Sequence, residues 1–518
     1  MSLRTWLVAC LALGLLKHGS GAASQVTLDY VARLAQERAA RPFRSPKADL
    51  PSFLRPEHLD YDKYREIEFR HEKALWAAEG LPYRVEFFHP GYLYQEPVQI
   101  HEFTLTRVQP VRFVQDFFNY RGLQLKKRIP PGLGYAGFRL LYRLNAPDRW
   151  DELGAFLGAS YFRLLGRDQR YGPSARGLAL DCGETDRAEE FPLFTDWWLG
   201  KPHRDDTQLR LYGLLDSVSC TGAFEFLIEP GETTVADVEA VLFFRAPELV
   251  KAVAPERKPV ATVGLAPLTS MFWFGKSSDR KFDDYRPEVH DSDGLLIQER
   301  NGEHLWRPLA NPRQMRHQRF ELKQPRGFGL LQRERAFACY QDLFNLYHQV
   351  PSIWVQPRGD WGEGAVHLVE LSTHYEGLDN VVAFWDPKLK PRPGQPFRYG
   401  YTLYWTLERD LKLSTERVVA TRVGAHPRFP TQRQFAVDFA GPKLAALKED
   451  SPPRAMATCT DNATIKETQV FYNRFEHCWR VMLSVEPRAG NQDAVDLRLR
   501  LYNGSEPLSE TWAYLWSP

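Results

Sequence analysis

The chain has 518 residues, with 67 Lys and Arg against 65 Asp and Glu, so its net charge is only +2. This balance argues against a protein that binds nucleic acid through its charge, and the length predicts two or more domains. The six cysteines are scattered without any C-x-x-C pair, so no metal site and no cofactor are expected. Cys459 and Cys478 form a disulfide or remain unpaired thiols, and the sequence leaves both readings open.

The first 23 residues have the pattern of a cleavable signal peptide. Arg4 precedes an apolar run from Thr5 to Leu16, and small residues follow as far as Ala23. The run is shorter than the roughly 20 residues that a membrane-spanning helix needs. A short positive region, an apolar stretch and a small-residue end are typical of secretory signals. The sequence therefore predicts a periplasmic protein, cleaved near Ala23 after export by the general secretory route.

Beyond the signal, one helix is followed mainly by strands. A helix is expected from Leu28 to about Ala40, with Thr27 as its N-cap, and a proline-broken segment follows. Alternating or aromatic-rich patterns predict strands over residues 83–101, 138–144, 209–215, 223–228, 241–245, 261–274 and 365–371. Two short helices are expected over 150–157 and 335–348. Regular turn signals between the strands favour a mostly β chain, either a sandwich or a barrel.

A second domain is predicted after a proline-rich segment. Residues 386–395 read DPKLKPRPGQ, and three prolines, a glycine and no apolar periodicity indicate a linker. The first domain is therefore placed at residues 24–390 and the second at 397–518. In the second, strands are expected over 398–407, 434–439, 468–472, 478–485, 495–502 and 510–516. Six or seven short strands in this length indicate an immunoglobulin-like β-sandwich.

Two short motifs match known ligand-binding patterns without the context that those patterns need. Gly132 to Gly137 satisfy G-x-G-x-x-G, but prolines precede the motif and a strand pattern follows it. A dinucleotide site needs a strand before the glycines and a helix after them. Residues 291–294 read DSDG but lack the further ligands of a calcium loop. We interpret both segments as ordinary loops.

Two stretches are dense in acids, arginines and aromatic residues. The first covers residues 282–294 and continues at 306–308; the second covers 359–362 and 374–385. Hydrolysis of a glycosidic bond needs a protonated acid for the leaving oxygen and a base for the attacking water, and paired carboxylates supply both. Aromatic rings pack against sugar rings. The pattern is therefore compatible with a saccharide site, although surface salt bridges and a sandwich core use the same residues.

Long motifs along nearly the whole mature chain identify a family resemblance. They include LGASYFR from Leu157, YGPSARGLALD from Tyr171, APLTSMFWFG from Ala266, DDYRPEVHDSDGL from Asp283 and DNVVAFW from Asp379. With these motifs the chain resembles the OpgG/OpgD (MdoG/MdoD) family of periplasmic glucan biosynthesis proteins. The resemblance implies a large N-terminal β-sandwich of the galactose-mutarotase-like kind, a C-terminal immunoglobulin-like sandwich and action on β-1,2-glucan. The G-type or D-type identity stays open.

The resemblance also implies roles for individual residues. Asp379, in the D-N-V-V-A motif, matches the family's general acid, and Asp291, in H-D-S-D-G, matches its base. Asp293 is the alternative base. The alternative for Asp291 is a structural role in which it forms a salt bridge with Arg286. Other expected substrate-site residues are Glu376, Tyr347 and Asp342, which match positions lining the family's cleft, and Arg286. Trp306, Trp361 and Trp385 are each either a sugar platform or a core residue. His290 and Arg307 are expected to hold the carboxylates in place.

The expected function is an anomer-inverting enzyme that cleaves or transfers β-1,2-glucan in osmoregulated periplasmic glucan biosynthesis. One alternative on the same scaffold is a transglycosylase that makes cyclic or branched glucan. Another is a non-catalytic periplasmic partner of an inner-membrane glucosyltransferase, which would receive the nascent glucan. The expected partners are the glucan and that enzyme, and no nucleic acid is expected to bind. The oligomeric state stays open, with a homodimer among the options.

Overall fold

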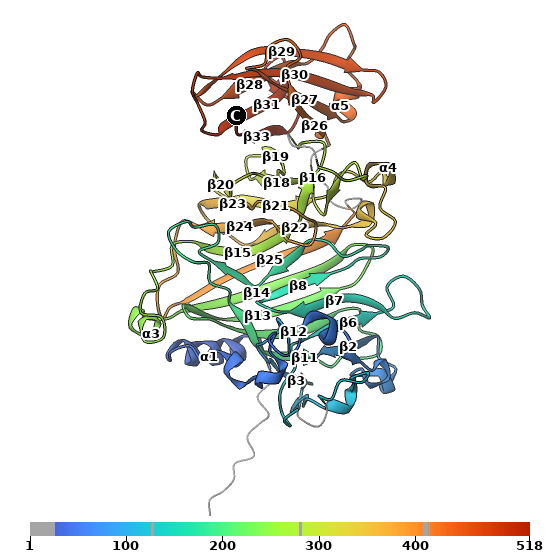
Figure 1. The fold of residues 1–518 in the computed structure, drawn as a ribbon, viewed down its shortest axis with the longest axis vertical. Helices are drawn as coiled ribbons and strands as arrows, with labels where there is room; N and C mark the ends of the chain where they lie inside the picture. Colours follow the sequence, from blue (N-terminus) through green and yellow to red (C-terminus); the bar gives the residue numbers. More distant parts are fainter. Residues whose placement is uncertain (1–25, 126–128, 279–281, 408–412, 414) are drawn as a thin grey trace, which may run out of the picture.

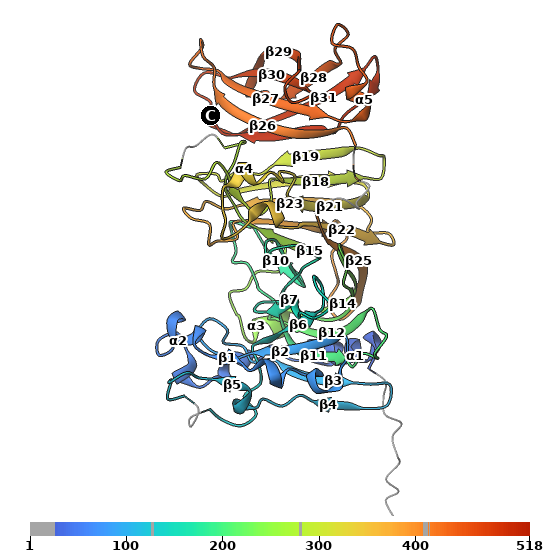
Figure 2. The same ribbon diagram turned by 90° about the vertical axis from the view of Figure 1, so that its right-hand side faces the viewer.

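The computed structural model describes residues 26–125, 129–278, 282–407, 413 and 415–518. The predicted signal peptide falls outside these residues. None of the helices in the described ranges is long and apolar enough to cross a membrane. The molecule is elongated and mostly β, with an N-terminal helix near one end and the C-terminal strands at the other (Figures 1 and 2).

The helices are short apart from the first. They are α1 (Leu28–Ala39), α2 (Tyr61–Arg65), α3 (Pro247–Lys251), α4 (Phe337–Tyr340) and α5 (Pro442–Ala445). The predicted N-cap of α1 is confirmed, because the Tyr30 amide donates to Thr27 Oγ1 at 3.1 Å. Apolar side chains on one face of this helix, including Val31 and Ala35, are buried against strands of the second sheet described below.

A ten-stranded sheet forms one layer of the first domain. Its strands are, in spatial order, β2 (Tyr83–Phe88), β6 (Gly137–Tyr142), β7 (Asp151–Leu157), β8 (Tyr161–Leu164), β9 (Ser174–Arg176), β15 (Val263–Ser270), β24 (Val381–Pro387), β23 (Gly364–Glu370) and β20 (Arg316–Leu322), with β10 (Leu178–Leu180) paired to β15. Two small ladders stand beside it: β1 (Glu68–Phe69) with β5 (Phe118–Asn119), and β16 (Phe272–Phe274) with β17 (Val289–His290).

A fifteen-stranded sheet forms the opposing layer and continues into the C-terminal domain. Its order is β28 (Arg454–Cys459), β31 (Val495–Asn503), β33 (Thr511–Trp516), β19 (His304–Pro308), β18 (Gly294–Glu299), β21 (Pro325–Leu331), β22 (Ser352–Arg358), β25 (Pro396–Thr406), β14 (Thr234–Phe244), β13 (Cys220–Glu229), β12 (Leu209–Asp216), β11 (Leu193–Gly200), β3 (Gln99–Phe103) and β4 (Val108–Pro110), with β32 (Glu506–Pro507) on β31. Alternating apolar residues of the two layers, Phe226 and Val366 among them, meet in one large core. The predicted β-sandwich is confirmed.

The C-terminal domain is a second, smaller sandwich. A four-stranded sheet of β26 (Arg417–Ala425), β27 (Arg433–Ala440), β30 (Cys478–Pro487) and β29 (Ala463–Asn473) faces β28, β31 and β33. Phe435 and Trp512 pack between the two layers. The parallel pairing of β33 with β19 aligns Trp512 with Trp306 and joins the two domains through one continuous sheet.

The predicted domain boundary is wrong. Strand β25, at the start of the predicted second domain, pairs along its length with β14 and β22 of the first. Asp386 is buried in β24, where its carboxylate accepts from the Val263 amide at 3.0 Å. The proline-rich segment is therefore a turn from β24 to β25, and it carries the chain from one sheet of the first domain to the other. Turns and domain linkers are both rich in proline and glycine, because neither forms the regular backbone hydrogen bonds of a β-sheet. The first domain extends through Thr406, and the second begins with β26.

The two predicted internal helices are also corrected. Residues 151–157 form β7, which is paired on both sides, with β6 and with β8; this pairing overrides the local helical preference. In the second segment, helix α4 ends after four residues because Gln341 adopts a left-handed conformation with φ 54°. Leu346 is also left-handed, and a single 3₁₀ turn follows at Tyr347–Gln349. The break places the side chains of this segment beside the candidate site.

The question of a disulfide is settled for the described residues. Cys459 lies on β28 and Cys478 on β30, in opposite layers of the C-terminal sandwich, and both are free thiols. The other three cysteines of the described ranges are free as well. The reading with unpaired cysteines is therefore the one that the structure supports.

Candidate active site

Asp291 and Asp379, far apart in the chain, lie close together in the fold. Asp291 directly follows β17, and Asp379 is the next-to-last residue of the connection from β23 to β24. The Asp291 side chain is partly buried and the Asp379 side chain is exposed to solvent. The two carboxylates are near enough for the charge on Asp379 to raise the pKa of Asp291. Asp291, Asp379 and Glu376, which lies three residues before Asp379, are called the carboxylate cluster below.

A single corner of the backbone positions both aspartates. The Asp291 amide donates to the Met271 carbonyl at 2.8 Å. The side chain of Asn380 is completely buried and binds the next residue, Phe272, accepting from its amide at 2.8 Å and donating to its carbonyl at 3.1 Å. It also donates to the Leu371 carbonyl at 2.9 Å. Asp291 and the residue after Asp379 are therefore hydrogen-bonded to neighbouring peptide groups of one corner.

The surroundings of the pair raise the pKa of both carboxyl groups. Burial raises the pKa of Asp291 well above its usual range, and the charges of Asp379 and Glu376 raise it further, while Arg163 opposes this. The protein around Asp379 also raises its pKa by limiting hydration, although the side chain reaches solvent, and Arg163 again opposes the shift. Two interacting carboxyl groups with raised pKa values tend to share one proton, so the pair can offer one acid and one base.

A hydrogen-bonded network fixes the third carboxylate. The Tyr347 hydroxyl donates to Glu376 Oε2 at 2.8 Å, and the Arg286 guanidinium donates to the same oxygen at 2.7 Å. Arg286 also donates to Asp342 Oδ2 at 2.8 Å. Burial raises the pKa of Tyr347, so this hydroxyl remains a donor at neutral pH. Glu376, Tyr347, Asp342 and Arg286 are thus brought together in one hydrogen-bonded group.

The ion pairs of Arg286 belong to this network and differ from the expected salt bridge with Asp291. In the described part of the chain, the ion pairs of Arg286 are with Asp284, Asp342 and Glu376, not with Asp291. Asp342 in turn accepts from the amides of residues 344 and 345, both at 2.8 Å, which holds the turn after α4. Asp291 is left with a carboxylate available for chemistry.

His290 has a supporting role that differs from the expected one. Its ring is fully buried and stacks on Phe272, with ring centroids 5.3 Å apart. One ring nitrogen lies 2.8 Å from Gln332 Oε1 and the other 3.3 Å from Glu288 Oε2. His290 therefore fixes the strand that leads into Asp291 without hydrogen-bonding either catalytic candidate.

Four residues named from the sequence are occupied by structural contacts; three of them are buried and the fourth, Asp293, is partly buried. Trp306 is buried between the two domains, with the Arg333 guanidinium 3.6 Å from its ring centroid. Arg307 is buried and binds Glu370 at 3.0 Å. Trp385 is fully buried in the first-domain core. Asp293 Oδ2 accepts from the Arg333 and Glu334 amides, both at 3.0 Å, so this residue holds a turn and is not placed as a base.

The position of Trp306 makes a stability prediction. Trp306→Ala should lower the free energy of unfolding by about 3–5 kcal/mol, because it removes a large buried ring between the domains, and it should leave glucan affinity unchanged. Denaturant unfolding and glucan titration measure the two effects. Phe475→Ala, which removes a side chain that is 95% exposed, is the control and should change stability by no more than about 0.5 kcal/mol. Lost glucan affinity at unchanged stability would restore Trp306 as a sugar platform.

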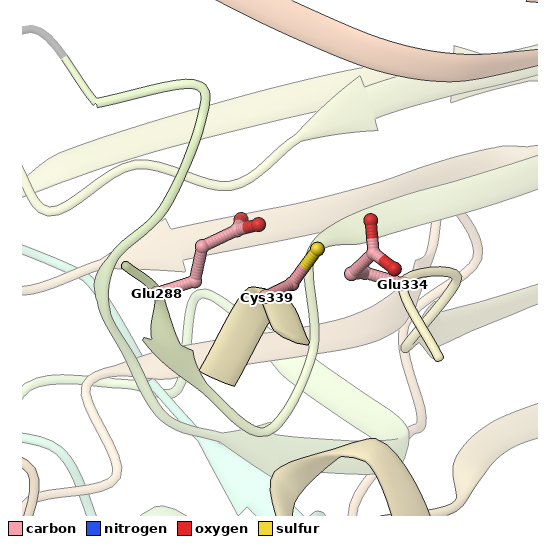
Figure 3. Close-up of side chains that lie close together, drawn as sticks. All are labelled: Glu288, Glu334 and Cys339. Atoms are coloured by element: carbon pink, nitrogen blue, oxygen red, sulfur yellow. The ribbon is translucent and has the colours of Figure 1, made fainter. Parts of the chain in front are cut away.

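One group of side chains has the spacing of metal ligands. The ligand atoms of Glu288, Glu334 and Cys339 lie within 4.8 Å of one another (Figure 3). The Lys276 ammonium lies among them, hydrogen-bonded to Glu334, 3.2 Å from Glu288 Oε1 and 3.5 Å from Cys339 Sγ. Burial opposes ionisation of Glu288, but the hydrogen bond with His290 and the charges of His290 and Lys276 lower its pKa to about 2. The lysine supplies the positive charge that these acids require.

Two residues near the pair were not assigned a role from the sequence. Tyr161 and Arg163 alternate along β8 with the buried Phe162 and Leu164, so both are on the face opposite to the core side chains. Burial raises the pKa of Tyr161, and the charge of Asp379 raises it further, while Arg163 lowers the pKa of both aspartates. The alternation in the LGASYFR motif is the signal that marks these two side chains as outward-facing.

A comparison with known families finds one match that spans both domains. The family described as periplasmic glucan biosynthesis protein, MdoG, matches residues 27–516, which is nearly the whole chain. This match covers both sandwiches and every residue of the cluster. The chain belongs to the MdoG family of periplasmic glucan biosynthesis proteins.

Proposed function

We propose that this member of the family is an enzyme that cleaves β-1,2-glucan, with Asp379 as general acid and Asp291 as general base. The observation that carries the proposal is the pairing of these two carboxyl groups, whose surroundings raise the pKa of each. A general acid must hold a proton at the pH at which a base has lost one, and an interacting pair satisfies both needs. The β-1,2 linkage is taken from the resemblance of the sequence motifs.

The exposure of the two groups supports this assignment of roles. In the free protein Asp291 is the less exposed group and has two carboxylates near it, which favours the shared proton on Asp291. A bound glucan would cover Asp379 and remove water from it, which raises the pKa of Asp379 further. The proton then moves toward Asp379, where it is given to the leaving oxygen, while ionised Asp291 accepts a proton from the attacking water. Inversion at the anomeric carbon follows from a single displacement of this kind.

Substrates with different leaving groups test the roles. An aryl β-glucoside chain needs little protonation of its leaving group, so Asp379→Asn should retain most of its turnover on this substrate and lose it on native glucan. Asp291→Asn should lose turnover on both, and added azide should restore part of it because azide needs no deprotonation. The opposite pattern of rescue would exchange the two roles.

The products separate cleavage from transfer. Purified mature protein, incubated with linear β-1,2-glucan, should release shorter linear chains, and NMR of the first products should show the α anomer. Cyclic or branched products would favour the transglycosylase. Unchanged glucan, at a protein concentration that binds it fully, would favour a non-catalytic partner of the membrane glucosyltransferase.

Arg163 sets the expected pH dependence. Its positive charge lowers the pKa of both aspartates, so Arg163→Met should raise both values and move the whole bell-shaped profile of kcat/KM to higher pH. The sign follows because each carboxyl group then holds its proton to a higher pH. Arg163→Lys keeps the charge and should leave the profile near its original position. A profile that stays in place in both variants would show that Arg163 does not act on the pair.

A further inference from the structure

A groove of about 800 Å³ lies at the end of the β23–β24 hairpin that is remote from the carboxylate cluster. In this hairpin Glu370 pairs with Val381 at one end and Gly364 with Pro387 at the other. The connection that contains Glu376 and Asp379 joins the strands at the first end, and the groove is lined beside the second. Seven residues at roughly 3.3 Å each separate the two ends by about 20 Å.

An aromatic ring in a fixed orientation lines this groove. Trp361 is half-buried, and its inner side packs against Trp385 and Tyr401 of the core, with ring centroids 6.3 and 6.1 Å away. Its indole N–H donates to the Gly400 carbonyl at 3.1 Å, so the polar edge of the ring is already satisfied. Leu389, which is 74% exposed, adds apolar surface to the lining. The groove therefore offers a rigid ring surface without an unsatisfied indole donor.

The charged side chains of the groove balance one another. Three acidic and three basic residues line it. Arg358 donates to Glu239 at 2.7 Å, and Lys388 lies 2.7 Å from Glu363. The close approach of Glu239 depends on Gly400, since a Cβ there would lie 2.6 Å from the Glu239 carboxylate. A groove without net charge does not select anions, whereas paired ionic groups beside an aromatic face suit an uncharged ligand rich in hydroxyl groups.

We propose that this groove is a second glucan-binding site, which holds a distant part of the polymer on which the carboxylate cluster acts. The identity of the ligand rests on the function proposed above. Trp361 then serves as a sugar platform, as its type and pattern suggested, but at the far end of the hairpin and not beside the catalytic pair. A long chain that occupies both sites gains affinity from the linked second contact, and a chain too short to span them does not.

Variants of the groove test this in the otherwise intact mature protein. Trp361→Ala and Leu389→Asp should raise KM for long linear β-1,2-glucan by roughly tenfold or more, leave kcat unchanged, and leave both constants unchanged for a short β-1,2-linked oligosaccharide. Leu389→Asp changes an exposed side chain and should preserve the fold, which thermal unfolding checks. Phe475→Ala removes an exposed aromatic ring on the other domain and should change neither constant.

Hydroxyl-radical footprinting of the Asp379→Asn protein separates the two proposals. Long glucan should protect both Trp361 and Tyr375, the exposed residue before Glu376, from oxidation, whereas the short oligosaccharide should protect Tyr375 alone. Protection of Tyr375 by long glucan with no change at Trp361 would overturn the second site and leave the proposed function standing. Protection of neither residue would remove glucan as the ligand of the cluster and of the groove together.

Discussion

Asp379→Asn is expected to lower the turnover of linear β-1,2-glucan by roughly 10²–10⁴-fold, the usual cost of losing a general acid. Asparagine keeps the size and hydrogen-bonding shape of the side chain but has no transferable proton, so glucan should still bind. Turnover is measured from the reducing ends released, and binding from titration of the variant with the same glucan.

Asp291→Asn should have a loss of similar size, because the attacking water then has no proton acceptor. The double variant should lose less than the product of the two single losses, since both groups serve one transition state. Asp461→Asn, an exposed aspartate on the C-terminal domain, is the matched control and should keep full turnover. Full activity in both single variants would remove the acid–base proposal and favour the non-catalytic partner.

Individual strands could be predicted from the sequence, but their grouping into sheets could not. Alternation along 398–407 shows that a strand has one buried face, and β25 does occupy residues 396–406. Its partners, β14 and β22, come from earlier parts of the chain and leave no mark in the local pattern. The first-domain sheets are built from such distant pairings. Composition alone therefore places the predicted domain boundary at the proline-rich segment, which most resembles a linker.

The site shows the same division between local and distant information. The motifs around Asp291 and Asp379 named the two residues, and the resemblance paired them. The contact that brings them together runs through Asn380 and the Met271–Phe272 corner, and no spacing rule connects these segments. Burial decides which of the three tryptophans can contact a ligand. Trp306 and Trp385 lie in strands and face cores, while Trp361 lies in a loop and keeps an accessible side.

Asn380 is therefore the residue through which the fold controls the geometry of the pair. It is buried, it uses both its acceptor and its donor group, and its three hydrogen bonds end on backbone groups of two segments. Since it follows Asp379 directly, any shift of its backbone moves the proposed acid. Asp291 is bound to the same corner through the Met271 carbonyl and would not move with it.

Asn380→Ala is expected to lower the free energy of unfolding by at least about 2 kcal/mol, because it leaves buried backbone groups unpaired at roughly 1–3 kcal/mol each. It should also lower kcat by roughly 10²-fold, the scale of loss that a misplacement of about 1 Å produces, with little change in KM because the glucan contacts remain. Asn301→Ala, an exposed asparagine in the β18–β19 turn, should change neither quantity appreciably. Denaturant unfolding and steady-state kinetics, measured where both variants are fully folded, check the two effects separately. If stability falls while kcat is retained, Asn380 supports the fold alone, and the relative position of the two aspartates is fixed elsewhere.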